Sequence, residues 1–503
     1  MPRRFLSSAL ALIILVGVFL RSQDILTPWT GVHNAWGGAV LGNIARNYLK
    51  YGYTETKLGQ VSNTGLAEPA EFEFYLHYPP LSVLLTSVSF HLFGVHEWSA
   101  RLVPWIFSVL ILGLTYLVAR RLYGQRVALL AAAMCAALPM EIYYGTHLDY
   151  YGSIAVFFSL LAVYGYIRWL DTRRRWDFAL CLAGVALGAM TAWFTYFVVP
   201  FILVHFYWFH RRPGKSPGYA LLILPLTTVV IFGVFLIQRN MALHHNEEVM
   251  GTMTGKLSAR IIFGGVDLPL AFTRHLHFVL KLFTPPVLVL ALGWLVFFLR
   301  DLRQGQPRAN DWFVVMLFGY GAVHNLIFPG FLAGHDYMGC CYSPAFAIAA
   351  AVGADRFLAI WRGETAPEWK HWAASLCLLM IFGLVLILSH RQIAAVRRSA
   401  PFFENLRRVG ELIHEKTSAR DVILLPKEED HVLAFYIDRR TQFSSDTFEQ
   451  ITSTVQRHDR KYFFACSQQS AEGLAELLQK LDARYPKISA TDPVIYDLTR
   501  RTP

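Results

Sequence analysis

The sequence predicts a polytopic α-helical membrane protein with about eleven transmembrane helices and a small α/β domain in its C-terminal part. Of its 503 residues 54% are hydrophobic and only 16% are charged, whereas a soluble domain is about 25% charged. The apolar residues form runs of about 17 to 25 residues, enough to cross a hydrocarbon core of about 30 Å. The excess Lys and Arg lie in short loops. The formal net charge of +11 therefore indicates helix orientation rather than a nucleic-acid partner.

The candidate spans support one orientation. They lie near residues 5–21, 101–119, 127–144, 153–170, 178–194, 196–209, 218–238, 276–299, 311–329, 341–361 and 371–389. If Arg3 and Arg4 are cytoplasmic, the five loops on that side are all rich in Lys or Arg, as the positive-inside rule requires. We therefore expect a cytoplasmic N-terminus, an outer loop at 22–100, and a tail on the outer side.

Two domains are expected: a membrane domain at 1–390, which includes the long first outer loop, and an extracytoplasmic α/β domain at 391–503. In the first outer loop, Pro79-Pro80 turn the chain and start an apolar segment at 81–95. That segment is too short to cross, so it predicts an interfacial helix. A further helix is expected at 36–48, capped by Asn34. In the tail, a strand is predicted after Asp421. Helices are predicted at 402–416 and 471–481, and a helix or strand at 431–437.

The motifs of familiar soluble sites are missing from the sequence. It has no P-loop, no GxGxxG after a strand, no HExxH and no GxSxG. The six cysteines show neither a metal spacing nor a disulfide pattern. Candidate chemistry therefore rests on polar groups that the topology places on the outer side, where ionisable residues at helix ends are functional candidates. They are Asp24, His33, Asn34, Arg46, Glu141, His147, Asp149, His244, His245, Glu247, Glu248, His335, Asp336 and Tyr337.

Each candidate also has a purely structural interpretation. Asp149 lies among aromatic residues near the membrane surface, where a desolvated carboxylate is costly without a partner, so catalysis or metal binding is favoured. The aromatics alone fit an interfacial belt. Asp24 is equally well explained as a solvated residue after a span. The His244–Glu248 run is typical of a solvated loop. His335 and Asp336 open a span, which favours a site over a simple turn.

Two stretches carry a resemblance to a known family. Residues 75–81 read Tyr-Leu-His-Tyr-Pro-Pro-Leu, and residues 92–104 read Leu-Phe-Gly-Val-His-Glu-Trp-Ser-Ala-Arg-Leu-Val-Pro. This pair resembles the first outer loop of the integral-membrane C-type glycosyltransferases, in the branch of protein O-mannosyltransferases and lipid A aminoarabinose transferases. The stretch from Thr115 to Gly124, the later loop with Asp149 and the outer tail are also similar. The resemblance covers roughly residues 1–390; the tail matches only in position and class.

The resemblance implies an inverting transfer of a hexose or pentose. The donor would be a polyprenyl-phosphate sugar, and the acceptor a lipid, glycan or protein of the cell envelope. In the family the general base is an acid early in the first outer loop. Here the matching place reads His33-Asn34, and Asn cannot act as a base. Four possibilities stay open: Asp24 through a shifted alignment, Asp149, His33, or a loss of the usual activity.

The remaining assignments follow from the same resemblance. Cations or a divalent metal would stabilise the leaving phosphate, with Asp149 and His335 as metal ligands. The residues expected to bind substrate are Asn34, Arg46, His77, Tyr78, Arg101, Lys281, His335 and Asp336. Arg46 and Arg101 also fit structural ion pairs, and Lys281 fits a side chain that reaches the outer interface. The implied location is a bacterial inner membrane, with the C-terminal domain in the periplasm.

Two other classes of function remain as alternatives. A transporter or flippase of a lipid-linked glycan would favour inverted repeats and charges at mid-membrane depth, whereas the charges here gather at one side. A non-catalytic membrane scaffold agrees with the presence of Asn34 where the family has an acidic residue. The sequence does not specify the sugar or the acceptor.

Overall fold

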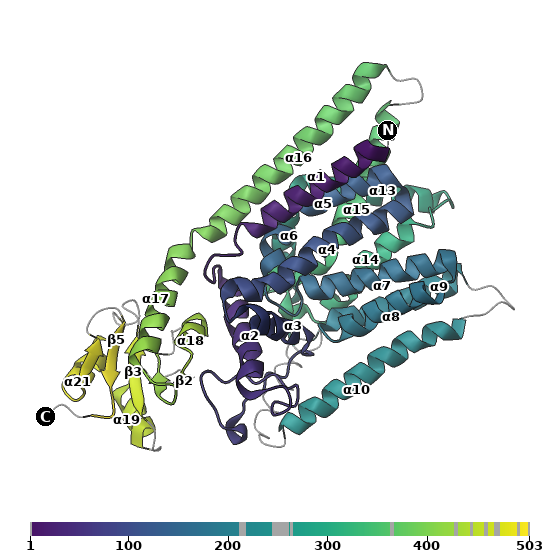
Figure 1. Ribbon diagram of the computed structural model, residues 1–503. Coiled ribbons are helices and arrows are strands. Elements are labelled where there is room, and N and C mark those ends of the chain that lie inside the picture. Colours follow the sequence, from purple (N-terminus) through teal and green to yellow (C-terminus); the bar gives the residue numbers. More distant parts are fainter. Residues whose placement is uncertain are drawn as a thin grey trace. The chain divides into compact units, whose positions relative to one another are not determined.

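The computed structural model describes residues 3–210, 218–243, 261, 265–362, 367–426, 431–442, 446–456, 461–466, 473–489 and 493–500 (Figure 1). Its contacts divide the chain into two compact units. One, here the helical unit, comprises Met1–Leu26, His77–Ser82 and Arg101–Ala395. The other, here the mixed unit, comprises Thr27–Leu76, Val83–Ala100 and Val396–Pro503. Most of the first outer loop thus folds with the C-terminal tail.

The helical unit is built from apolar helices. Its helices and 3-10 turns are α1 (Arg3–Ser22), α4 (Glu97–Tyr123), α5 (Gln125–Ala137), α6 (Pro139–Tyr143), η2 (Tyr144–Thr146), α7 (Ser153–Thr172), α8 (Arg175–Ala189), η3 (Trp193–Phe197), α9 (Val198–Phe209), η4 (Gly218–Leu222), α10 (Ile223–Leu243), α12 (Leu268–Phe283), α13 (Pro285–Arg303), α14 (Asp311–Ile327), η5 (Pro329–Phe331), η6 (Asp336–Tyr342), α15 (Ser343–Arg362) and α16 (Glu368–Arg397). The first turn of α4 and the end of α16 belong to the mixed unit.

Length and composition decide which of these helices qualify as spans. Within the described ranges, six helices are long and apolar enough to cross a membrane, or seven if the bent pair α5–α6 counts as one span. Four shorter apolar helices, of 10 to 17 residues, lie at Ser7–Ser22, Leu81–Phe93, Trp193–Phe209 and Asp311–Ile327. The fold is therefore that of a multi-span membrane protein, and the count of about eleven stays a prediction.

Small residues let the helices of this unit pack closely. α7 lies beside α8 and α9 (Figure 1). A Cβ atom added at Gly165 of α7 would come within 2.4 Å of the backbone of α8 at Cys181, and one at Gly184 equally close to Ala162. At Gly353 of α15 an added Cβ would lie 2.1 Å from the carbonyl oxygen of Leu290 in α13. Glycine is required there because the helix backbones are in direct contact, as is common between membrane helices.

One predicted span is wrong in its continuity. The segment 276–299 was expected to cross as a single helix, but α12 ends at Phe283 and α13 begins at Pro285. The residue between them, Thr284, has a φ of 62°, outside the right-handed helical region. The cause is Pro285-Pro286, since proline disfavours the helical conformation of the preceding residue and starts a new helix well. The predicted break between 178–194 and 196–209 is confirmed, at the end of α8.

The mixed unit combines first-loop helices with a sheet. Its elements are α2 (Val32–Tyr51), η1 (Pro69–Glu71), α3 (Leu81–Phe93, from Val83 on), α17 (Ala400–Lys416), β1 (Val422–Leu424), α18 (His431–Ile437), β2 (Arg440–Gln442), α19 (Phe448–Gln456), β3 (Tyr462–Cys466), α21 (Ala475–Asp482), β4 (Lys487–Ser489) and β5 (Val494–Asp497). The strand order is β2-β1-β3-β5-β4. β1 is parallel to β2 and β3, whereas β5 is antiparallel to β3 and β4.

The tail predictions are confirmed where the described residues allow a test. The strand after Asp421 is β1, the helix at 402–416 is α17, and 431–437 is a helix. A core of Leu424, Phe464, Leu481 and Tyr496 closes over the sheet. The prediction that Asn34 caps the first-loop helix is wrong: α2 begins at Val32, after Gly31. Gly31 has a φ of 77°, which glycine adopts without steric cost, so the helix starts two residues before Asn34.

Candidate functional site

A buried carboxylate–imidazole pair occupies the loop after α6. The backbone N–H of Tyr151 donates to Asp149 Oδ1 at 2.7 Å, and Asp149 Oδ2 lies 3.5 Å from Nε2 of His147. His147 is 1% exposed, and neither ring nitrogen has a hydrogen-bond partner among the described residues. Nor does any Lys or Arg of the described chain form an ion pair with Asp149. Asp149 thus faces the ring of His147 with one carboxylate oxygen and the backbone of Tyr151 with the other.

The loop before α15 lies against this pair. The ring of Tyr337 is 5.7 Å from that of His147 and 5.2 Å from that of His335, between centroids. Tyr144 contacts both His147 and Tyr337 with its ring. The carboxylates of Asp149 and Asp336 both act electrostatically on the Cys340 thiol. The loop that carries Asp149 and the loop that carries His335 therefore meet. We call Tyr144, His147, Asp149, His335, Asp336 and Tyr337 the loop cluster.

The segment before α3 adds an aromatic wall. Tyr78 stacks on Tyr150 with ring centroids 4.7 Å apart, and its ring meets Tyr151 edge to face at 5.2 Å. The hydroxyl of Tyr151 is 3.1 Å from Nε2 of His324 in α14. Trp193 fixes the same segment, because its indole N–H donates to the carbonyl oxygen of His77 at 2.9 Å. Asp149 is thus flanked by aromatic residues that are themselves held in place.

The buried side chain of Arg21 supports the segment that leads into the loop cluster. Leu138 alone separates α5 from α6, which begins at Pro139, and the two helices are bent by 59°. Arg21 of α1 donates to the carbonyl oxygens of Cys135 and Ala136 at the end of α5, at 3.0 and 3.1 Å. Its Nη2 also lies 3.7 Å from the carboxylate of Glu141 in α6. A cation suits the free carbonyls of a helix C-terminus, so Arg21 holds the bend that leads into the loop cluster.

Two cations share one face of α12. Arg274 is exposed, and its Nη1 donates to the carbonyl oxygen of Ala333, two residues before His335, at 3.1 Å. Lys281 is half-buried in the last turn of the same helix. Residues seven apart lie on one helix face, about 10 Å apart along the axis. The sequence analysis named Lys281 but missed Arg274; the seven-residue spacing was the signal.

The remaining sequence candidates of the helical unit lie outside the loop cluster. Asp24 is half-buried in the turn after α1. Arg101 is 1% exposed, and its Nη1 donates to the carbonyl oxygen of Ile25 at 3.3 Å. The side chain of His33, and residues His244, His245, Glu247 and Glu248, lie outside the described part of the chain.

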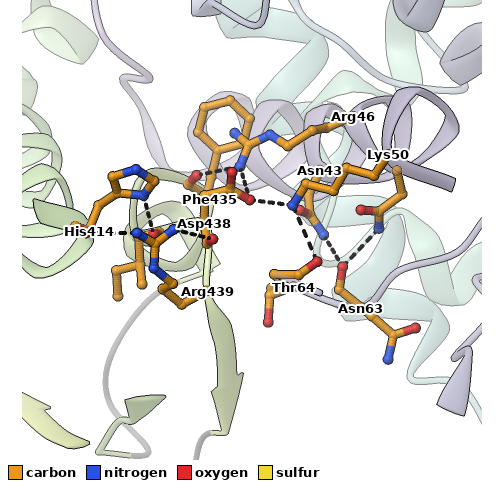
Figure 2. Close-up of polar contacts among 12 residues, drawn as sticks. Asn43, Arg46, Lys50, Asn63, Thr64, His414, Phe435, Asp438 and Arg439 are labelled. Carbon is orange, nitrogen blue, oxygen red and sulfur yellow. Dashed lines mark hydrogen bonds and ion pairs between the residues drawn. The ribbon is translucent and has the colours of Figure 1, made fainter. Parts of the chain in front are cut away.

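Arg46 and Asn34 belong to the mixed unit. Arg46 is 7% exposed and lies 2.8 Å from Asp438 Oδ1 (Figure 2). It also donates to the carbonyl oxygen of Phe435 at 3.0 Å and covers that ring at 4.3 Å. Lys50, one turn further along α2, binds the same Oδ1 at 2.5 Å. Asp438 was not predicted. The side-chain oxygen of Asn34 is buried and has no hydrogen-bond partner among the described residues.

Burial and charge compete in this triad. Burial alone would raise the pKa of Asp438, but Arg46 and then Lys50 outweigh it and hold that pKa below its ordinary value. Burial lowers the pKa of Lys50, and Asp438 offsets this only in part. The lowered pKa of Asp438 indicates a favourable ion pair, whereas the lowered pKa of Lys50 indicates that burial outweighs its attraction to Asp438. Because Arg46 is the stronger partner, we take Arg46–Asp438 as the stable ion pair and Lys50 as a weaker second cation.

The described residues were tested for a metal site. They contain no group of three or more His, Cys, Asp or Glu side chains that could hold a metal ion. Asp149 and His335, the predicted ligands, both belong to the loop cluster but make no complete ligand set there.

Comparisons with solved structures identify the fold. The chain is similar to ArnT from Cupriavidus metallidurans, solved bound to undecaprenyl phosphate, with a TM-score of 0.64, 14% identity, and coverage of 99% of this chain and 98% of that one. It is also similar to the apo oligosaccharyltransferase of Archaeoglobus fulgidus, with a TM-score of 0.56, 14% identity, and coverage of 98% and 74%. An archaeal oligosaccharyltransferase AglB structure from the same organism, with an inhibitory peptide and a dolichol-phosphate, gives the same TM-score of 0.56 at 13% identity.

The chain therefore has the fold of the membrane-embedded C-type glycosyltransferases, and the resemblance seen in the sequence is confirmed. Within that fold, residues 77–237 match the dolichyl-phosphate-mannose-protein mannosyltransferase family. An uncharacterized protein of Aquifex aeolicus (strain VF5) is 28% identical over 146 residues. That match spans 28% of this chain and 29% of the relative. The family match includes Tyr78, His147 and Asp149.

Proposed function

We propose that this protein transfers a sugar from a polyprenyl-phosphate donor to an acceptor of the cell envelope on the extracytoplasmic side, with inversion at the anomeric carbon. Asp149 is the general base. The observation that carries the proposal is the buried His147–Asp149 pair, which lacks a cationic partner among the described residues. The fold of the helical unit supports a lipid-linked donor. So do the similar structures solved with undecaprenyl phosphate or dolichol-phosphate bound.

Asp149 suits a base because its two oxygens have different surroundings. The N–H of Tyr151 fixes Oδ1 at 2.7 Å, which leaves Oδ2 to accept the proton of an acceptor hydroxyl. Among the described residues neither Arg nor Lys forms an ion pair with this carboxylate, so a substrate hydroxyl has no Arg or Lys to displace from Oδ2. His147 Nε2, at 3.5 Å from Oδ2, can donate to the same hydroxyl oxygen and orient it. Positioned general bases typically contribute 10²- to 10⁴-fold.

The reaction is a single displacement. The acceptor oxygen forms a bond to the anomeric carbon while the bond from that carbon to the donor phosphate oxygen breaks. The bonding electron pair leaves with the polyprenyl phosphate, and the acceptor proton passes to Asp149. Arg274 and Lys281 on one face of α12 are the cations we assign to the phosphate, since positive charge stabilises a departing phosphate. The stacked rings of Tyr78 and Tyr150 are buried and support the loop that carries Asp149.

The side of the membrane on which the reaction takes place is also part of the proposal. Five Lys- and Arg-rich loops support a cytoplasmic N-terminus, which puts the loop cluster on the opposite side, away from the cytoplasmic nucleotide sugars. We propose a bacterial inner membrane, with the tail in the periplasm.

Mass spectrometry of cell-envelope glycolipids and glycoproteins tests the proposal. Deleting the gene is expected to remove one sugar from one class of acceptor, and the wild-type gene restores it. Restoration by an Asp24→Asn variant, but not by Asp149→Asn, supports the assignment of the base. An envelope with an unchanged sugar content in the deletion strain contradicts the proposed function.

A further inference from the structure

The mixed unit contains a second binding feature that the proposed reaction does not use. A cleft of about 540 Å³ is lined by residues from α2, the start of α4, α17 and α18. Its volume falls in the range usual for small-ligand sites. The lining residues are Arg46, Leu49, Lys50, Val95, His96, Glu97, Glu411, His414, Phe435, Tyr436 and Asp438. All of them lie within one compact unit.

The charges of this cleft are largely balanced from within. Asp438 binds Arg46 at 2.8 Å and Lys50 at 2.5 Å (Figure 2). Arg407 lies 4.0 Å from Glu97 and 3.5 Å from Glu411. A phosphate would compete with Asp438 for both of its cations while facing two further carboxylates. The cleft therefore favours a ligand without net charge.

The polar groups of the cleft that these ion pairs leave available are mainly hydrogen-bond acceptors in fixed positions. Arg46 and Lys50 both bind Oδ1 of Asp438, so a carboxylate with several lone pairs keeps acceptor capacity on Oδ2. Nδ1 of His414 is 2.9 Å from the carbonyl oxygen of Ile437. Because that carbonyl only accepts, Nδ1 carries a hydrogen, and Nε2 is the acceptor in the tautomer with a single N–H. The cleft thus presents acceptors from two different elements.

Donors and apolar surface complete the lining. The buried Nε–H of Arg46 has no hydrogen-bond acceptor in the described part of the chain. The hydroxyl of Tyr436 donates to Glu97 Oε1 at 2.9 Å and accepts from the N–H of Trp29 at 3.3 Å, which fixes its ring. Leu49 and Val95 add aliphatic surface between the polar groups.

We propose that this cleft binds a neutral saccharide, and that it is the site for the sugar portion of the acceptor. A saccharide carries many hydroxyls that donate to fixed acceptors, ring C–H faces that pack on apolar side chains, and no charge. The second half of the proposal rests on the proposed glycosyltransferase function; the first half does not. The acceptor is then a glycan or glycolipid that already carries sugar, rather than an unmodified polypeptide.

Saturation-transfer NMR on the full-length protein in detergent tests the binding. The probes are free neutral disaccharides of hexoses, 6-deoxyhexoses and pentoses, and binding of inorganic phosphate and of Mg²⁺ is measured separately by isothermal titration calorimetry. We expect at least one disaccharide to bind. Leu49→Trp, which fills the cleft from a side chain 37% exposed, should weaken that binding at least tenfold. Leu66→Trp, at a similarly exposed position of the same unit outside the cleft, should not change it.

A second pair of variants, one inside and one outside the cleft, tests whether a loss of binding is caused by misfolding. Glu411→Ala removes a cleft acceptor and should weaken binding about twofold to tenfold, the worth of one hydrogen bond. Glu415→Ala, one turn further along α17 and outside the cleft, should leave it unchanged, and all four variants should melt close to the wild type. Binding that survives Leu49→Trp overturns the proposal. So does binding of phosphate or Mg²⁺ in place of any disaccharide, or no binding at all.

Kinetics separate this proposal from the function on which it rests. In a transfer assay, Leu49→Trp should raise the acceptor KM at least tenfold with kcat unchanged. If the deletion strain loses no sugar, the transferase proposal fails while the NMR result still decides whether the cleft binds a saccharide. If transfer occurs but Leu49→Trp leaves the acceptor KM unchanged, the acceptor-site assignment alone fails.

Discussion

Two aspartates with opposite surroundings distinguish the two units of this protein. Asp149, in the helical unit, receives a backbone N–H and faces the imidazole of His147, with no ion pair to Lys or Arg among the described residues. Asp438, in the mixed unit, binds both Arg46 and Lys50. Cations stabilise the ionised carboxylate and weaken it as a base. Asp438 therefore joins segments that are far apart in the sequence, whereas the role proposed for Asp149 is proton transfer.

The sequence positions of the partners strengthen this contrast. Asp149 and His147 are close neighbours in one loop, whereas Arg46 and Lys50 lie almost four hundred residues before Asp438. Arg440 and Thr441 add contacts of the same long-range kind, to Glu71 at 2.7 Å and to Thr64 at 2.7 Å between hydroxyl oxygens. An added Cβ at Gly65 would lie 2.1 Å from the backbone of Arg440. The segment 438–441 is thus an integral part of the first-loop fold.

The largest expected effect is on catalysis at Asp149. Asp149→Asn keeps the size of the side chain but removes the base, so sugar transfer by the purified protein should fall by about 10²- to 10⁴-fold with the melting temperature little changed. Asp171→Asn, in an exposed pair with Arg121, should keep full activity. If Asp149→Asn remains active and Asp24→Asn does not, the base is Asp24 and the contrast between the two aspartates fails.

Asp438→Asn should act on stability. It leaves two partly buried cations without their counter-charge, which we expect to cost about 1 to 3 kcal/mol of unfolding free energy. Hydrogen exchange of the backbone amides in α2 and in 434–442 should speed up accordingly, as read by mass spectrometry. Glu476→Gln, in an exposed pair with Lys480 of the same unit, is the control and should leave those amides unchanged. Unaltered exchange in Asp438→Asn would show that the triad holds nothing together.

Much of the fold followed from the sequence, whereas the roles of the predicted site residues stay predictions. Apolar runs and charged loops gave the membrane class and placed the loops of Asp149 and His335 on one side, where the structure brings them together. Local pattern also gave α17, β1 and the break after α8. These features depend on neighbouring residues, so a linear pattern was enough to predict them.

The rest depended on contacts between distant segments. Asp438 stands between Ile437 and Arg439 without any motif, and only folding brings it to Arg46. For the same reason Arg46 was predicted as a phosphate ligand, and that role stays a prediction beside its ion pair with Asp438. The break at Thr284 was a local signal that was missed, because Pro285-Pro286 was treated as the interior of a span. Arg274 was missed because the predicted span began at residue 276, although Arg274 lies seven residues before Lys281 on one amphipathic helix.

Arg274→Gln should have an intermediate effect, confined to the donor. Losing one phosphate contact by an exposed arginine should raise the donor KM about fivefold to tenfold, with the acceptor KM unchanged. Arg274→Lys should restore part of the loss, since it keeps the charge. Arg175→Gln, at an exposed arginine that begins α8, is the control for net charge. An equal rise in both KM values would indicate general damage rather than a phosphate contact.

The smallest effect is the pH dependence that Asp438 gives to the mixed unit. Its pKa is lowered in the folded state, so the folded protein binds fewer protons there than the unfolded chain. The stabilisation is fully present above the ordinary value of about 3.9 and is lost as the pH falls through the lowered folded pKa. The protection factors of the amides in 434–442, which correct for the slower intrinsic exchange in acid, should therefore fall below about pH 4 in the wild type. That fall should be smaller in Asp438→Asn, which has no carboxyl to protonate. Asp149 makes no corresponding ion pair, so Asp149→Asn should keep the wild-type acid profile of this segment. The same acid profile in the wild type and Asp438→Asn would assign the transition to other carboxyl groups and remove the electrostatic half of the comparison.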